Sequence, residues 1–195
     1  MAKIKKRKKF FDVEIPLIKK ETQLQGFDIE NLQGRYIKYD LTRALRGKNL
    51  ILKSIVQIEN EKATAIPQEI KIMPSYLKRM IRKGTNYVED SFSAEAKDSQ
   101  IRIKPFLITR RKVSRAIRKA LREKAREELI NYVKTKKTEE IFQEILKNNL
   151  QKMLSLKLKK IYPLSLCEIR ILKVEKRLKE KKEIKKSEAK EKTKE

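Results

Sequence analysis

Hydrophobic and polar residues alternate in several short runs through the first half of the chain. The run GRYIKYDL (34–41) alternates, and LILKSIVQIE (50–59) is rich in β-branched residues. A period of two is typical of a half-buried β-strand, because successive side chains point to opposite faces of a sheet. The run AIPQEIKIM (65–73) predicts a third strand, and Pro67 places it at a sheet edge because proline cannot donate to a neighbouring strand.

A short basic helix and a hairpin follow these strands. Pro74 opens the helical run SYLKRMIRK (75–83), and a glycine comes directly after it. The segments YVEDSFSAEA (87–96) and QIRIKPFLI (100–108) alternate on either side of a short turn, which predicts a β-hairpin. The expected order of elements is three strands, a helix and a hairpin. This order lacks the regular alternation of strands and helices that is typical of a parallel sheet. The order favours an α+β fold whose core is an antiparallel curled sheet or is barrel-like.

After residue 110 the hydrophobic period becomes helical. In RRKVSRAIRKALREKAR (110–126), five arginines spaced three or four apart fall within an arc of about 80° at 100° per residue. We call these five the arginine ridge: Arg111, Arg115, Arg118, Arg122 and Arg126. The apolar residues expected on the far side, toward the core, are Val113, Ala116, Ile117, Ala120 and Leu121. Past residue 125 the apolar positions rotate around the axis, which predicts a bend or a new packing partner.

A second helix and a last strand complete the expected elements. TEEIFQEILKNNLQKML (138–154) begins with Thr138, and its first turn carries two glutamates that suit a helix N-terminus. IYPLSLCEIRIL (161–172) returns to strand character. We therefore expect the long basic helix and further helices to pack on the sheet.

Composition divides the chain into three regions. Residues 1–9 form a basic arm with six Lys or Arg, and residues 173–195 form a tail in which basic and acidic residues mix with few apolar ones. We expect the tail to be disordered or a frayed helix, since little in it could anchor a helix. Residues 10–172 between them are expected to form a single globular domain.

The net charge and the composition limit the classes of function that the chain can have. Lys and Arg number 52 against 26 Asp and Glu, which leaves +26 and favours a polyanionic partner. The chain has no histidine, so histidine acid–base catalysis and histidine-containing zinc sites are excluded. Its four glycines never cluster into a phosphate-binding loop, and its one cysteine forms no disulfide framework and fits a reducing compartment. We expect no enzyme activity, no small-molecule substrate, no cofactor and no metal.

Targeting to or through a membrane is not expected. No apolar run exceeds four residues, which is too short to span a bilayer. The N-terminal MAKIKKRKKFF has a basic start but lacks the apolar stretch of a signal peptide. The sequence predicts a soluble, intracellular protein.

The arginine ridge predicts contact with phosphates. Planar arginine side chains suit phosphate oxygens, and the ridge has no acid on its own arc. A membrane-surface helix would carry bulkier apolar residues opposite the charge. Double-stranded DNA stays open as a target, although no helix-turn-helix, zinc module or basic zipper is visible, and the aromatic strand signature of the commonest single-stranded RNA reader is missing. Basic arms, a basic helix and a compact core favour structured RNA, with these candidate contacts: Lys3, Lys5, Lys6, Arg7, Lys8, Lys9, Arg35, Arg110, Arg111, Lys112, Arg115, Arg118, Lys119, Arg122 and Arg126.

Four blocks of the sequence, in order, resemble one ribosomal protein family. They are KKFFDVEIP (8–16), LQGRYIKYDLTRAL (32–45), the strand leading into TRRKVSRAIRKALREKA (109–125), and IYPLSLCEIRILKVEK (161–176). The family is the archaeal and eukaryotic small-subunit protein called S-three-a-e, or e-S-one, and this chain resembles its archaeal members. The resemblance covers approximately residues 8 to 176, but the segments from about 46 to 100 match by pattern alone.

The resemblance implies a role in the ribosome. A member of this family would be an α+β protein with a barrel-like core on the platform of the small subunit. It would bind small-subunit ribosomal RNA near the messenger exit and the RNA's 3′ region, beside other platform proteins. It would be cytoplasmic, free of membranes and not a homo-oligomer. The alternative is a free DNA- or RNA-binding module of the chromatin or RNA-chaperone type.

Overall fold

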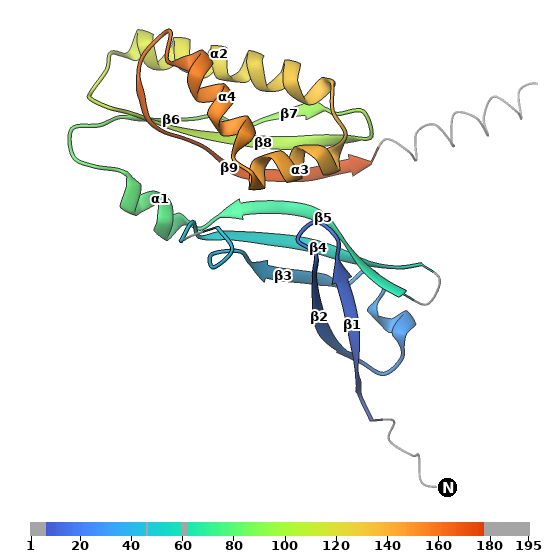
Figure 1. Ribbon diagram of the computed structural model, residues 1–195. Helices are drawn as coiled ribbons and strands as arrows, with labels where there is room; N and C mark the ends of the chain where they lie inside the picture. Colours follow the sequence, from blue (N-terminus) through green and yellow to red (C-terminus); the bar gives the residue numbers. More distant parts are fainter. Residues whose placement is uncertain (1–6, 46, 60–61, 178–195) are drawn as a thin grey trace, which may run out of the picture. The chain divides into compact units, whose positions relative to one another are not determined.

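The computed structural model of this 195-residue chain describes residues 7–45, 47–59 and 62–177 (Figure 1). Candidate contacts Lys3, Lys5 and Lys6 and most of the charged tail lie outside these ranges. The chain divides into two compact units, residues 1–70 and 71–195, so the division falls inside the range expected as one domain. Each unit is described by itself below.

The first unit is a twisted β-sheet with one short helix. β1 and β2 form an antiparallel hairpin in which Phe10 faces Gln25, and β3 runs antiparallel to β4. β1 also pairs with β5, in parallel at Val13 and Glu14, and β4 pairs with β5. The elements are β1 (Lys9–Ile15), β2 (Lys20–Gly26), the 3-10 helix η1 (Ile29–Leu32), β3 (Tyr36–Asp40), β4 (Leu50–Glu59) and β5 (Lys62–Ile72).

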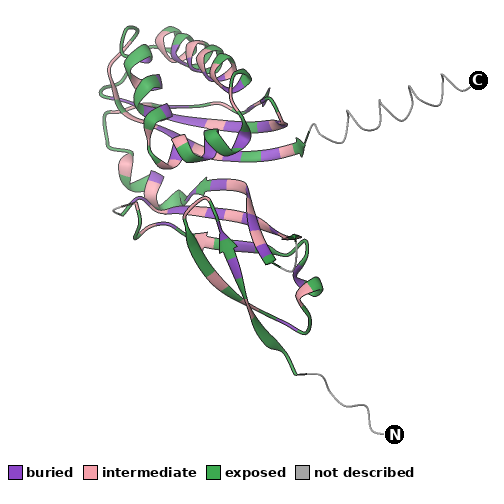
Figure 2. Ribbon diagram, turned by 45° about the vertical axis from the view of Figure 1, so that its right-hand side comes forward, coloured by how far each residue is buried: buried purple, intermediate pink, exposed green. Residues whose placement is uncertain are grey.

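Alternation along these strands builds the core of the first unit. Buried and half-buried positions alternate along most of β4 and β5 (Figure 2), as the period of two predicts. Val13, Leu52 and Ala65 are fully buried. Pro67 was expected at an edge, but β5 has β1 and β4 as neighbours. Its pairing with β1 ends near Thr64, so the strand needs no donor toward β1 at Pro67.

The second unit packs helices on an antiparallel sheet. β8 lies in the centre of this sheet, with β9 on one side and both β6 and β7 on the other. α2 packs against β6 and β7, α4 packs against β9, and α3 packs against α4 (Figure 1). The elements are α1 (Pro74–Met80), β6 (Tyr87–Glu89), β7 (Phe92–Glu95), β8 (Ser99–Thr109), α2 (Arg115–Lys134), α3 (Thr138–Leu146), α4 (Asn149–Leu158) and β9 (Leu164–Arg177).

The expected α+β class and the helices packed on the sheet are confirmed. One detail differs from a wholly antiparallel core, because the parallel pair of β1 and β5 makes the sheet mixed. Within each unit the strands do not close into a barrel, so the sheet is open rather than barrel-like. The predicted hairpin is present, with its first strand interrupted between β6 and β7.

Helix α2 buries a narrower stripe than the sequence predicts. Four residues spaced four apart are buried, while Ile117 is half-buried and Ala116 and Ala120 are exposed, so those two alanines were wrongly placed in the core. A spacing of four advances by about 40° around the axis at each step. The stripe therefore rotates toward the side of the arginines along the helix, as expected past residue 125. The buried residues are Leu121, Ala125, Leu129 and Val133.

Two boundaries also differ from expectation. The helix predicted over 138–154 is two helices, α3 and α4, because Asn148 adopts a left-handed conformation with φ of 59°. The last strand continues to Arg177, so residues 173–177, assigned to the tail, belong to the sheet.

A buried polar cluster fixes the start of α3. The Asp98 carboxylate accepts hydrogen bonds from the backbone N–H of Thr138 at 2.9 Å and from its hydroxyl at 2.7 Å. The same hydroxyl lies 2.6 Å from that of Ser99. Asp98 thus caps α3 from the turn of the β7–β8 hairpin, which joins two segments 40 residues apart.

Replacing Asp98 by Ala will lower the free energy of unfolding by about 1–2 kcal/mol, as loss of a capping side chain does. Guanidinium denaturation of the whole chain measures this change. Glu95→Ala is the matched control, because Glu95 is exposed in the same hairpin and should change stability by less than about 0.5 kcal/mol. Equal losses in the two variants would contradict the capping role.

Candidate nucleic-acid interface

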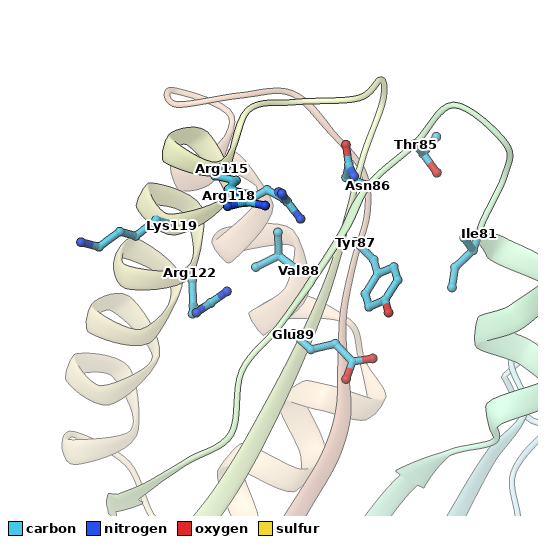
Figure 3. A pocket seen from close by; sticks show the side chains of 10 residues that line it. All are labelled: Ile81, Thr85, Asn86, Tyr87, Val88, Glu89, Arg115, Arg118, Lys119 and Arg122. Atoms are coloured by element: carbon cyan, nitrogen blue, oxygen red, sulfur yellow. The ribbon is translucent and has the colours of Figure 1, made fainter.

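A groove of about 650 Å³ runs between the first half of α2 and strand β6 (Figure 3). One wall is the basic face of the helix, and the other is β6 with the loop before it. The residues that line the groove are Ile81, Thr85, Asn86, Tyr87, Val88, Glu89, Arg115, Arg118, Lys119 and Arg122. Four of the ten are cationic, and Glu89 is the acidic one.

Hydrogen bonds between the two walls set the position of α2. Ser114 is the N-cap residue, and its hydroxyl accepts from the backbone N–H of Ile117. The Asn86 side-chain carbonyl accepts from the backbone N–H of Val113 at 2.9 Å. Thr109 at the end of β8 donates its backbone N–H to the Asn86 carbonyl at 2.9 Å. These bonds fasten the first turn of the helix beside the beginning of β6.

The arginines of the groove have no carboxylate to neutralise them within the described residues. The acids of α2 pair with lysines instead: Lys119 with Glu123, Lys124 with Glu127 and Glu128, and Lys157 with Glu128. The hydrogen bond from Lys157, with a smaller contribution from Lys124, lowers the pKa of the Glu128 carboxyl. Glu89 accepts two hydrogen bonds from Nη1 of Arg170, at 3.0 and 3.1 Å. The groove therefore presents excess positive charge.

Arg118 is the most constrained of these side chains. It is half-buried, and its Nε is buried without a hydrogen-bond partner in the described structure. Figure 3 shows Arg118 and Arg122 directed toward β6, whereas Lys119 points away from it. A buried guanidinium N–H that lacks an acceptor carries a desolvation cost.

The remaining ridge residues are arranged differently from the prediction. Arg111 was placed on the helix, but α2 begins at Arg115, so Arg111 lies in the exposed segment before it together with Arg110 and Lys112. The capping of α2 by Ser114 is the physical reason. Arg126 is on the helix and exposed, with its guanidinium carbon 5.5 Å from the ring centre of Phe92.

The other described candidates belong to the first unit. Arg7, Lys8 and Lys9 are exposed at the start of β1, and Nζ of Lys8 lies 5.7 Å from the ring centre of Phe27. Nη1 of Arg35 donates to the backbone carbonyl of Gln25 at 2.9 Å. The predicted RNA contacts thus form two groups, one in each unit.

Two features are absent from the described residues. None of their helices combines the length and the apolar character needed to cross a bilayer. No three metal-ligating side chains gather among them.

Comparison with known proteins confirms the resemblance drawn from the four sequence blocks. The model of the Ribosomal S3Ae family matches residues 3–178. The small ribosomal subunit protein eS1 of Nanoarchaeum equitans is 29% identical over 168 residues, which are 81% of this chain and 84% of that protein. The protein of the same name from Pyrobaculum arsenaticum is 28% identical over 138 residues, 70% of this chain and 63% of that protein. The chain belongs to the Ribosomal S3Ae family.

Proposed function

We propose that this chain is a structural protein of the small ribosomal subunit that binds folded ribosomal RNA on the platform, near the messenger exit. Membership of the Ribosomal S3Ae family and similarity to archaeal eS1 proteins support the ribosomal role. In this proposal it works in translation on the cytoplasmic ribosome, as a single copy beside neighbouring platform proteins. It has no catalytic part in the process.

The groove of the second unit is the observation that carries the mode of binding. Arg115, Arg118 and Arg122 line it without a carboxylate partner among the described residues, and Glu89 is already bonded to Arg170. Guanidinium groups arranged along one face of a helix can donate hydrogen bonds to the oxygens of successive phosphates. Contacts to phosphates position a protein on folded RNA but read little sequence, so we expect few base contacts from this groove.

Charge supplies the driving force for assembly. With a net charge of +26, the protein displaces condensed cations from the RNA when it binds, and the repulsion among its own positive charges is relieved.

Sedimentation of the tagged chain in a lysate of its own cells tests the proposal. We expect the protein in the small-subunit fraction, near one copy per subunit, after a moderate salt wash. A free nucleic-acid-binding module would instead remain near the top of the gradient or follow DNA, and that result would replace the ribosomal role. A tagged basic protein of similar charge serves as the control for adventitious binding.

A further inference from the structure

The outward face of the β1–β2 hairpin carries two exposed phenylalanines. The Phe10 side chain is 68% exposed and the Phe27 side chain is 41% exposed. In the hairpin register Phe10 lies opposite Gln25, and continuing that register places Lys8 opposite Phe27. Since side chains alternate, Lys8, Phe10, Gln25 and Phe27 share one face of the hairpin. The opposite face supplies the buried Val13 and Ile15.

The residue before Phe27 faces the interior of the unit. Gly26 is buried, and a Cβ atom there would lie 3.1 Å from Cδ2 of Leu32 in η1, so a side chain at residue 26 would require Leu32 to shift. Because successive side chains alternate, Phe27 faces the other way and is exposed.

One of these rings has a cation beside it. Nζ of Lys8 lies 5.7 Å from the ring centre of Phe27. Arg35 is held at the edge of β2 by its hydrogen bond to the backbone carbonyl of Gln25, which uses one of its five donors. The same pairing recurs on β3 and β4, where Nζ of Lys53 lies 4.0 Å from the ring centre of Tyr36, which is 52% exposed. The same face also carries three acids, Asp12, Glu14 and Glu21, all of which lie further along the hairpin from Phe10 toward its turn.

We infer that this face of the first unit binds unpaired nucleotides, with bases stacked on Phe10 and Phe27 and phosphates held by Lys8 and Arg35. Exposed aromatic rings interleaved with cations are the chemistry that recognises single-stranded nucleic acid, because every base offers a flat face for stacking. A duplex hides its bases and would leave both rings unused. A partner protein with a purely apolar surface would gain no binding energy from the cations beside the rings. The inference rests on the proposed function for RNA as the ligand, but it adds a second site of different chemistry in the other unit.

Tryptophan fluorescence gives a direct test. The chain has no tryptophan, so Phe10→Trp introduces a single reporter on the proposed face. We expect an unstructured pyrimidine decamer to quench this reporter through stacking. A blunt-ended RNA duplex of equal length and inorganic polyphosphate should bind through charge and leave the fluorescence unchanged. Absence of quenching by the decamer at saturation would overturn the inference.

Affinity measurements on the full chain separate base stacking from other uses of the face. Replacing Phe10 and Phe27 together by Ala should weaken decamer binding by about tenfold or more, with the salt dependence unchanged because no cation is removed. The double Tyr variant should bind as the wild type does, and the double Leu variant should bind as weakly as Ala. If Leu restores binding, the face is an apolar docking surface and not a stacking platform. Failure of small-subunit sedimentation would reject the proposed function and leave these measurements unaffected.

Discussion

Replacing Arg111, Arg115, Arg118 and Arg122 together by Gln will flatten the salt dependence of RNA affinity. Each phosphate contact releases about one counterion, so the slope of log affinity against log salt should fall by about three units. The loss should be similar on a platform RNA fragment and on an unrelated folded RNA, because phosphate contacts carry little sequence information. A salt titration of both proteins on both RNAs measures the slopes.

A matched pair of double variants controls for net charge. Arg115→Gln with Arg122→Gln removes two exposed charges that have no carboxylate partner within the described residues, and should lower the slope by about 1.5 units. Lys124→Gln with Lys157→Gln removes two charges that already pair with Glu127 and Glu128, and should change the slope little. Equal effects would mean that the slope reports overall charge and not the groove.

Strands were the most predictable part of the fold, because alternation depends on local residues alone. The pattern of 50–59 matches β4 at both ends, and the hairpin around residue 97 is where the pattern places it. The break of the long second helix was not predictable in this way. It depends on Asn148 adopting a left-handed conformation, which polar residues such as asparagine tolerate without requiring it.

The arginine ridge shows what periodicity can and cannot establish. Spacing placed Arg115, Arg118 and Arg122 on one face, and the structure lines one groove with them. Spacing could not find the start of the helix, which Ser114 sets as N-cap residue, so Arg111 was misplaced. A serine ahead of an apolar-periodic run is a recognised start signal and could have corrected this. The second wall of the groove, including Asn86 and Tyr87, depends on tertiary packing and left no local signal.

The exposed phenylalanines had a signal that was present in the sequence. In KFFDVEI, Phe11, Val13 and Ile15 share one face, so alternation alone puts Phe10 on the polar face. Alternation likewise puts Phe27, one residue past the end of β2, on the polar face with Gln23 and Gln25. The aromatic strand signature that the sequence lacks is a single motif, and its absence does not bear on single rings on separate strands.

Unfolding measurements will separate the residues that hold the second unit together from those that serve the groove. Leu121→Ala should lower the free energy of unfolding by about 2–5 kcal/mol, because the Leu121 side chain is fully buried on the inner face of α2 and its removal leaves a cavity. Ile117→Ala should cost less, since Ile117 is half-buried.

Arg115→Gln with Arg122→Gln should leave the free energy of unfolding within about 0.5 kcal/mol of wild type, or raise it by relieving repulsion along the helix. Arg118 is left out of this pair because its half-buried side chain contributes packing as well as charge. Guanidinium denaturation followed by circular dichroism measures all three variants. If replacing the two arginines destabilises the protein as much as Leu121→Ala does, these arginines stabilise the fold itself. The proposal that the groove binds phosphates would then be wrong.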